Sequence, residues 1–274
     1  MQTENDPAPA LRALVEATLN EVLPAATERP AILAEAMRYA VGSGGKRIRP
    51  LICLASAMAV GGKAEDAKYP AAAIEILHNY TLVHDDLSAM DNDVLRRGQP
   101  TVWKKFGEAN AILAGDALLA LAYQTAARAP RNVAAIVGVL GEKGVGVVRG
   151  QVEDVKRNDR IIESSNDRIE ECSAISFIYL HKTADLFVAA AKMGALAGGG
   201  CPGDVEKLER FALNLGLAFQ YEDDLLDGDG LASRAEAERR VSETTAAAIA
   251  ALEGLPGETG FLRELARRLV GRKA

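Results

Sequence analysis

Residues 70–91 read PAAAIEILHNYTLVHDDLSAMD, and this stretch joins a strong helix signal to a cluster of aspartates. The leading proline suits the first turn of a helix, and the Ala, Ile and Leu residues that follow are apolar and helix-forming. His78, Leu82 and Asp85 recur at i, i+4 and i+7, which places them on one stripe of a helix. The stretch therefore predicts a buried helix over residues 70–86 that ends in carboxylates.

Two aspartate clusters each end an apolar run. The first contains Asp85, Asp86 and Asp91, and the second contains Asp223 and Asp227, which share a helix face at i, i+4. Because Asp91 lies six residues beyond Asp85, the first helix must end near Asp86 for both carboxylates to face one site. A solvated acidic helix end explains either cluster alone, but buried carboxylates are normally paired or bound to metal. Together the clusters predict two walls of one cavity, with oxygen ligands suited to Mg²⁺.

The composition favours helices along the whole chain. Of 274 residues, 49% are hydrophobic, much of that Ala and Leu, and only 5% are aromatic. No alternating pattern is long enough to build a sheet. Helices are expected over residues 11–23, 31–41, 50–60, 70–86, 109–129, 132–155, 167–197 (one or two helices), 204–227, 234–252 and 261–269. Asp204 is the expected N-cap of its helix, and the glycines of residues 144–150 indicate close helix packing. No linker interrupts the chain, so residues 1–274 are predicted to form a single all-α domain.

Charge and cysteine content narrow the possible partners. The net charge is −6 and the pI about 5.3, which makes the whole protein a poor partner for nucleic acid. Three cysteines lie far apart without a CxxC pair, so reduced thiols are expected. The N-terminus is polar, and no run of about 18 apolar residues predicts a membrane span. These features predict a cytoplasmic protein without nucleic-acid or membrane partners.

Three basic groups accompany the acidic clusters. Residues 44–50, GGKRIRP, open a helix, where free N–H groups and the helix dipole favour anions. Arg96 and Arg97 follow the first aspartates, and Lys182 with Thr183 lies in an apolar helical context. A surface lysine or arginine is usually only solvated. Three such groups beside two acidic clusters instead predict an anionic substrate that chelates Mg²⁺.

Several motifs, in order along the chain, resemble those of trans-isoprenyl diphosphate synthases, the polyprenyl synthetase family. They are residues 44–50 (GGKRIRP), 78–101 (HNYTLVHDDLSAMDNDVLRRGQPT), 114–119 (AGDALL), 150–151 (GQ), 181–183 (HKT) and 219–227 (FQYEDDLLD). The motifs extend over most of the chain and are most like those of bacterial short-chain farnesyl and geranylgeranyl diphosphate synthases. The resemblance implies an all-α bundle of long helices around a deep central cavity, usually in a homodimer.

The resemblance also implies a role for each matching residue. The ligands of Mg²⁺, about three ions per active site, would be Asp85, Asp86, Asp91, Asp223 and Asp227. The allylic diphosphate would be bound by Arg96, Lys182, Thr183 and Gln220. Isopentenyl diphosphate would be bound by Gly45, Lys46, Arg49, His78 and Arg97.

The implied reaction is a condensation of isopentenyl diphosphate with an allylic diphosphate. Metal ions and cationic side chains stabilise the leaving diphosphate, so the allylic C–O bond ionises. The catalytic residues would be Lys182, Thr183 and Gln220, because the oxygens of Thr183 and Gln220 face the allylic cation in such enzymes. The double bond of isopentenyl diphosphate attacks this cation, and a proton is lost to the released diphosphate.

Product length should follow the depth of the cavity beside the helix that carries Asp85. Tyr80 and Thr81 lie five and four residues before Asp85, about 6–7.5 Å down the axis at 1.5 Å per residue. In similar enzymes an aromatic residue here, with the insertion Ser88-Ala89, accompanies short products. The resemblance therefore implies a floor at Tyr80 and Thr81 and farnesyl diphosphate as the product, with geranylgeranyl or geranyl diphosphate as alternatives. Ordinary core packing is the other explanation for Tyr80.

The sequence departs from the family pattern after Asp227. The family usually has a Gly- and Lys-rich loop ending in Lys-Ser/Thr-Thr, whereas residues 228–234 read GDGLASR. A true deletion of that loop would weaken diphosphate binding and closure of the site. Glu222 and Asp185 are also unusual for the family, but neither replaces a motif residue.

Two other functions stay open from the sequence. The missing loop is compatible with a non-catalytic regulatory subunit of a heteromeric prenyl synthase, although both aspartate motifs are intact. A terpene cyclase would ionise the same substrates, but such enzymes usually lack the set Lys46, Arg49 and His78. The sequence leaves open whether Arg272 and Lys273 fold over the isopentenyl diphosphate site.

Overall fold

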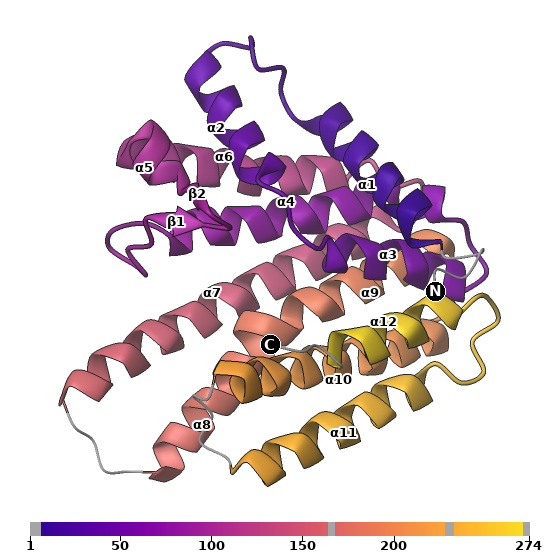
Figure 1. Cartoon of the computed structure of the whole chain (residues 1–274). Helices are drawn as coiled ribbons and strands as arrows, with labels where there is room; N and C mark the ends of the chain where they lie inside the picture. The colour runs from indigo at the N-terminus through magenta and orange to yellow at the C-terminus, as the bar shows by residue number, and fades with distance from the viewer. Residues whose placement is uncertain (1–6, 164–167, 228–232, 271–274) are drawn as a thin grey trace.

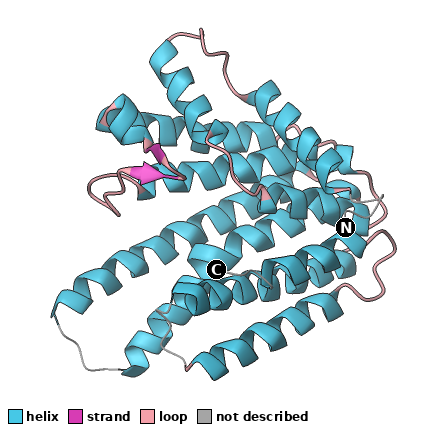
Figure 2. Ribbon diagram, viewed as in Figure 1, coloured by secondary structure: helices cyan, strands magenta, loops and turns pink. Residues whose placement is uncertain are grey.

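The computed structural model describes residues 7–163, 168–227 and 233–270, and the side chains of residues 158–172, 227 and 270 lie outside the description. Almost all of the described chain is helical (Figures 1 and 2). The helices are α1 (Ala8–Val22), α2 (Ala31–Gly42), α3 (Ile48–Ala59), η1 (Ala64–Ala67), α4 (Lys68–Asp85), α5 (Val102–Phe106), α6 (Glu108–Ala126), α7 (Val133–Glu163), α8 (Arg168–Ile178), η2 (Tyr179–Ala184), α9 (Asp185–Gly198), α10 (Pro202–Asp227), α11 (Arg234–Ala251) and α12 (Gly260–Val270). The all-α prediction is confirmed.

Helices α3 and α9 form the centre of the molecule, because nearly all of their residues are buried. They approach closely where Gly194 faces Cys53: a Cβ on Gly194 would lie 2.0 Å from the Cys53 carbonyl oxygen. Small residues therefore allow the two backbones to touch, which explains the Ala- and Gly-rich composition. The buried apolar cluster around them extends from Leu11 to Leu269.

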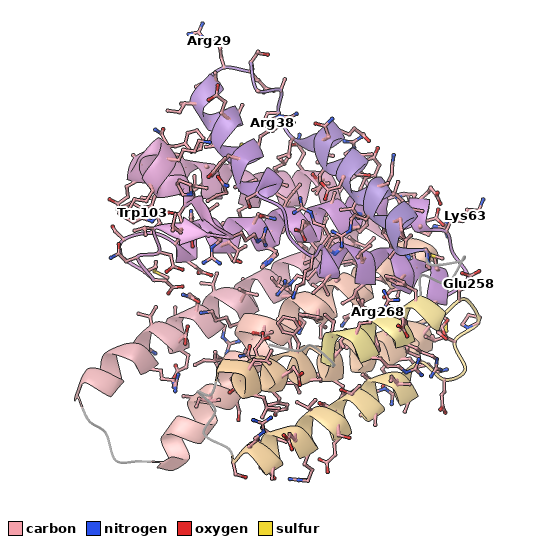
Figure 3. The ribbon with its side chains drawn as sticks, viewed as in Figure 1. Arg29, Arg38, Lys63, Trp103, Glu258 and Arg268 are labelled. Carbon is pink, nitrogen blue, oxygen red and sulfur yellow. The ribbon has the colours of Figure 1, made fainter. Side chains whose placement is uncertain are left out.

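The other helices surround this pair in two groups. Figure 1 shows α1, α2, α4 and α6 on one side and α8, α10, α11 and α12 on the other, with α7 and α9 between them. Charged side chains such as Arg29, Lys63 and Glu258 lie at the periphery (Figure 3). Helix α4 of the first group contacts α7, and both α7 and α10 of the second group contact the turn η2.

The predicted secondary structure needs five corrections. Helix α3 begins at Ile48, after Arg47 in a left-handed conformation, and α7 continues to Glu163. Asp204 is not the N-cap of α10: the helix begins at Pro202, and the Asp204 carboxylate accepts a hydrogen bond from the Cys201 N–H at 3.2 Å. A two-stranded hairpin, β1 (Leu95–Arg96) with β2 (Gln99–Pro100), is too short to have a strand pattern in the sequence. The fifth correction is η2, a π-helical turn between α8 and α9.

One described segment, Ser173–Gly198, is long and apolar enough to cross a membrane by length and composition alone. Its C-terminal part is α9, which packs against α3, α7 and α10 inside the protein. We interpret the segment as a core helix.

Candidate active site

The first aspartate cluster lies where helix α4 ends. Asp85 is the last helical residue, and the chain then turns so that the Asp91 N–H donates to the Asp85 carbonyl at 2.9 Å. Asn92 completes the turn with a positive φ of 53° and donates its N–H to the Leu87 carbonyl at 3.0 Å. The predicted end of the helix near Asp86 is confirmed, and this turn returns Asp91 to the level of Asp85.

Two carboxylates of this cluster, Asp85 and Asp91, are poorly compensated. Burial raises the pKa of Asp85 to about 7; Lys182 lowers it, and Asp91 and Asp86 raise it further. Burial also raises the pKa of Asp91, against the lowering effect of Lys182 and with the raising effect of Asp154. The ammonium of Lys182 thus acts on both aspartates from a different helix. A further cation here would stabilise the charged carboxylates.

Asp86 and Arg96 bind each other. Arg96 donates to Oδ1 of Asp86 at 2.6 Å and lies 3.3 Å from the Asp93 carboxylate, and Asp86 is only 3% exposed. The sequence assigned these two residues to metal and to diphosphate respectively. For Asp86 to bind metal and Arg96 to bind diphosphate, the Asp86–Arg96 ion pair must open, or each side chain must keep this contact while it also contacts its ligand.

The turn η2 presents Lys182 and Thr183. The Lys182 ammonium lies 2.5 Å from the Asp154 carboxylate of α7, and the Thr183 hydroxyl donates to Oε1 of Gln220 at 2.9 Å. Gly150 of α7 makes this approach possible, because a Cβ there would lie 2.4 Å from the Lys182 backbone nitrogen. The sequence predicted close packing at this glycine but not the π-turn. Such turns are rare and often occur at functional sites.

The second aspartate cluster lies at the end of α10. Gln220 donates from Nε2 to Oδ1 of Asp224 at 3.1 Å, and the Tyr179 hydroxyl donates to Oδ2 of Asp224. Asp223 is partly buried, and Asp227 ends the helix, with its side chain outside the described residues. The sequence reasoning did not assign Asp224 or Tyr179. Gln220, the partner of Asp224 at i−4, was a signal for Asp224, and no local signal marked Tyr179.

The fit of Mg²⁺ can be tested against the charges of the site. Asp85 is half-buried and Asp91 is exposed, both carboxylates have raised pKa values, and hard oxygen ligands of this kind are those that Mg²⁺ prefers. The chemistry of the first cluster therefore fits a divalent cation. Among the described side chains, which exclude Asp227, no three His, Cys, Asp or Glu groups converge closely enough to bind one ion. The full ligand set stays a prediction.

The glycine-rich loop before α3 is fixed by Arg47, which the sequence analysis left without a role. Arg47 is 4% exposed and binds Glu16 at 2.8 Å and Glu75 at 2.7 Å. Arg12 of α1 donates to the carbonyls of Gly45 and Lys46, at 3.2 and 2.8 Å. Helix α1 therefore positions the loop, and Lys46 remains exposed. These partners are distant in sequence, so no local pattern predicts them.

A second basic group forms beside this loop. Arg49 lies 3.2 Å from Nε2 of His78, and Arg97 donates to the Gly44 carbonyl, with its guanidinium against Gly45. Burial, then the charges of Arg49, Arg97, Arg96 and Arg47, lower the pKa of His78 well below 6.5. Arg49 Nε and His78 Nδ1 are buried without a hydrogen-bond partner. The structure thus brings Gly45, Arg49, His78 and Arg97 together, with donors free for an anion.

Tyr80 and Thr81 face different surroundings. The Tyr80 ring packs edge-on against His84, with 4.9 Å between centroids, and burial with the charges of Asp116 and Asp85 raises its pKa. Tyr80 therefore faces α6, which carries Asp116. The Thr81 hydroxyl donates to the His78 carbonyl of its own helix at 2.8 Å. Of these two residues, Tyr80 is the one that presents a bulky group towards α6.

Two polar residues of α7 were given no role by the sequence. Asp154 is the partner of Lys182, and Gln151 is 8% exposed with both amide atoms unpartnered. The motif at residues 150–151 marked Gln151 in the sequence, and Asp154 is at i+3 on the same helix. Both therefore add polar groups to the wall formed by α7.

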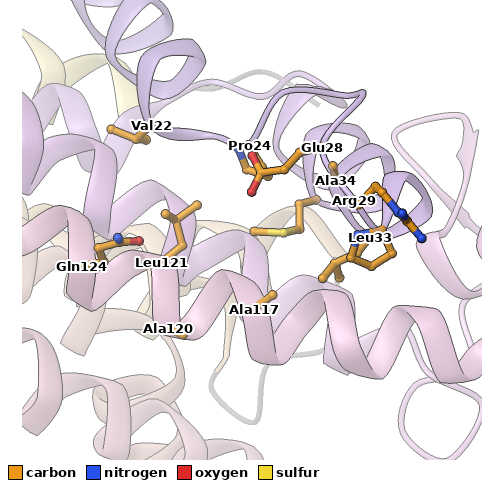
Figure 4. A pocket seen from close by; sticks show the side chains of 12 residues that line it. Val22, Pro24, Glu28, Arg29, Leu33, Ala34, Ala117, Ala120, Leu121 and Gln124 are labelled. Carbon is orange, nitrogen blue, oxygen red and sulfur yellow. The ribbon is translucent and has the colours of Figure 1, made fainter.

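A surface pocket of about 560 Å³ lies elsewhere, between the end of α1, α2 and α6 (Figure 4). Its lining residues are Val22, Pro24, Glu28, Arg29, Pro30, Leu33, Ala34, Met37, Ala117, Ala120, Leu121 and Gln124. None of these is a predicted site residue.

The chain is similar to a known protein family over most of its length. Residues 30–254 match the family model described as polyprenyl synthetase. The chain is 44% identical over 207 residues to a chloroplastic geranylgeranyl pyrophosphate synthase of Capsicum annuum, covering 73% of this chain and 54% of the relative. It is 43% identical to the large subunit 1 of a heterodimeric geranylgeranyl pyrophosphate synthase of Arabidopsis thaliana, covering 78% of this chain and 58% of the relative. The chain thus spans little more than half the length of these curated relatives.

Solved structures match over nearly the whole chain. An FPP/GFPP synthase from Zymomonas mobilis superposes with a TM-score of 0.83 and 33% identity, covering 96% of this chain and 99% of that one. A geranylgeranyl pyrophosphate synthetase from Geoglobus acetivorans superposes with a TM-score of 0.85 and 30% identity, covering 97% of this chain and 100% of that one. With the family model matching most of its length, the chain belongs to the polyprenyl synthetase family.

Proposed function

We propose that the protein is a trans-prenyltransferase that condenses isopentenyl diphosphate with dimethylallyl or geranyl diphosphate. The observation that supports this most is the pairing of two anion-binding groups. One joins Lys182 to the aspartates of α4, and the other joins Arg49, His78 and Arg97 beside the glycine-rich loop. Two diphosphates need two such groups.

The residues divide between the two substrates. Asp85, Asp86, Asp91, Asp223 and Asp227 would bind Mg²⁺, which supplies positive charge to the allylic diphosphate. Arg96 and Lys182 would bind the same diphosphate. Gly45, Lys46, Arg49, His78 and Arg97 would bind isopentenyl diphosphate, to which a neutral His78 donates through one ring nitrogen.

The reaction follows from these positions. The allylic C–O bond breaks and its electron pair leaves with the diphosphate. Thr183 and Gln220 oxygens stabilise the allylic cation, and the double bond of isopentenyl diphosphate forms the new C–C bond. A proton then passes from the product cation to the released diphosphate. Apolar helices exclude water, which would otherwise quench the cation.

We propose farnesyl diphosphate as the main product. The bulk of Tyr80 between α4 and α6 supports this length. Geranylgeranyl diphosphate is the second candidate, since curated relatives carry that name. The Tyr80→Ala variant should lengthen the product, because it removes the proposed floor; an unchanged length would exclude Tyr80 as the determinant.

We propose a homodimer as the active form. Helices α6 and α7 pack beside each other and expose apolar side chains: Ile112, Leu113, Val145, Val148 and Val152. Such a stripe is typical of a protein interface. One relative is named as a subunit of a heterodimer, so a different partner on this face is the alternative. A cytoplasmic location also stays a prediction.

The proposal is tested with purified protein, Mg²⁺, isopentenyl diphosphate and each of dimethylallyl, geranyl and farnesyl diphosphate in turn. Products are identified by mass spectrometry. Farnesyl diphosphate from the first two starters, and little turnover of the third, is the expected result. Absence of any condensation would contradict the enzyme and would favour a regulatory subunit.

A further inference from the structure

Asp224, the second aspartate of the α10 cluster, has both oxygens engaged within the protein. Oδ1 accepts from Nε2 of Gln220 at 3.1 Å, and Oδ2 accepts from the Tyr179 hydroxyl. Asp224 is one residue after Asp223, a rotation of about 100° on a helix of 3.6 residues per turn. On this helix Asp224 lies about 40° from Gln220 and about 60° from Asp227, so it stays near both, and its carboxylate is bonded to the Gln220 amide.

This pairing determines the orientation of the Gln220 amide. The Thr183 hydroxyl lies 2.9 Å from Gln220, and a hydroxyl can either donate or accept. Thr183 alone would therefore tolerate both orientations of the amide. An ionised Asp224 only accepts, so the Gln220 NH₂ must point to Asp224 and the Gln220 oxygen to Thr183. The two hydrogen bonds therefore hold the Gln220 amide in a single orientation, with its partial negative charge towards Thr183.

Tyr179 fixes Asp224 in turn. Its ring packs edge-on against Tyr221, with 5.7 Å between centroids and 78° between planes. Burial and the neighbouring Asp224 raise the pKa of Tyr179, so the phenol remains a donor. Because Tyr179 belongs to the turn η2, the same element carries both Thr183 and the residue that holds Asp224.

We propose that Tyr179 and Asp224 are positioning residues that keep the oxygen of Gln220, rather than its NH₂ group, towards Thr183 and the reacting allylic carbon. This role rests on the proposed prenyl transfer. An amide oxygen carries partial negative charge and stabilises a developing cation, whereas an amide NH₂ would oppose it. The pair thus acts on the ionisation step without touching either substrate.

The Tyr179→Phe variant tests this role, because it keeps the ring against Tyr221 and removes only the donor. We expect kcat to fall about 10-fold, as for other supporting partners of a site, with KM for both substrates and the Mg²⁺ requirement unchanged. Asp224→Asn should lower kcat by about 10–100-fold. Tyr221→Phe is the matched control and should keep the wild-type kcat, because no hydrogen bond joins its hydroxyl to Asp224.

A double-mutant cycle with Gln220→Ala separates positioning from general structural support. If Tyr179 acts through the amide, Tyr179→Phe has no further effect on kcat in the Gln220→Ala background. If Tyr179→Phe lowers kcat by the same factor in the wild-type and Gln220→Ala backgrounds, the positioning role is overturned. It is also overturned if the defect of Asp224→Asn is an increased Mg²⁺ requirement. If thermal melting shows that the Tyr179→Phe variant is unfolded, Asp224→Asn takes its place in the cycle. If the wild-type protein shows no prenyl transfer, the proposed function itself is refuted. If the wild type turns over normally but the losses of the two single variants add in the double variant, the positioning role alone is refuted.

Discussion

At the scale of single residues, the sequence identified the charged groups but not the partners that hold them. Asp85, Lys182 and His78 stand in motifs of recognisable type and spacing. Asp154, the partner of Lys182, comes from another helix 28 residues away in sequence, and only the family resemblance, not a local pattern, placed Arg49 beside His78, 29 residues away. Local patterns report which side chains are charged, whereas packing decides which of them meet.

The environment of His78 predicts a pH dependence of stability. Its pKa is well below 6.5 in the folded protein because it is buried beside arginines, and it returns to its ordinary value on unfolding. Below about pH 6.5 the unfolded chain binds one more proton at this residue, so the contribution of His78 to stability should fall by up to about 1.4 kcal/mol per pH unit, whereas the raised pKa of Asp85 acts in the opposite direction. Urea unfolding between pH 7.5 and 5 measures the slope. The His78→Asn variant should have a shallower slope, and an identical slope would contradict this prediction.

Removal of Arg47 should destabilise the protein strongly. Arg47→Met leaves Glu75, which is 3% exposed, without its charge partner, and such losses cost about 3–5 kcal/mol. Chemical denaturation measures the loss. The double variant with Glu75→Gln should recover part of it, because the uncompensated charge is gone. A double variant as unstable as Arg47→Met would show that the loss comes from packing instead.

At the scale of elements, helix composition predicted most segments correctly, but the irregular turns were missed. The π-turn η2 has no composition signal, since it differs from a helix by hydrogen bonding alone. The hairpin of β1 and β2 has only two residues in each strand, too few for an alternating pattern. Both elements lie next to predicted site residues. Sequence reasoning therefore failed mainly where the backbone is specialised around the site.

The packing of α7 against η2 gives a matched pair of glycine variants. Gly150→Ala would place a Cβ 2.4 Å from the Lys182 backbone, so η2 must shift, at a cost of about 1–3 kcal/mol. Gly138→Ala on the same helix meets nothing within 4 Å and should be neutral or stabilising by up to about 1 kcal/mol. Thermal melting and turnover of the two variants measure the difference. Equal effects would mean that η2 does not depend on this contact.

At the scale of the whole molecule, the all-α architecture followed from composition and from the family resemblance, whereas the assembly did not. The exposed stripe on α6 and α7 becomes visible only when the two helices are placed side by side. The loop that the family usually has after Asp227 would fall at residues 228–232, outside the described chain. Residues 272 and 273 also lie outside it, so any closure over the site by either segment stays a prediction.

Light scattering on the purified protein tests the proposed dimer. The wild type should have twice the 29.0 kDa mass of the chain, and Val148→Asp should shift it to the monomer by placing charge in the stripe. Val94→Asp is the control, because Val94 is similarly exposed, 48% against 46%, but lies on the turn before β1. Monomeric wild-type protein, or equal dissociation by both variants, would contradict an interface on α6 and α7.

The most direct test of the central claim is the rate of condensation of dimethylallyl with isopentenyl diphosphate by the wild type and by Asp85→Asn, both with Mg²⁺. Asp85 belongs to the poorly compensated cluster that faces Lys182, so its charge should be needed for ionisation. We expect turnover by the wild type and a loss of at least about 100-fold in the variant. No turnover by the wild type, or equal rates in both proteins, would contradict the account.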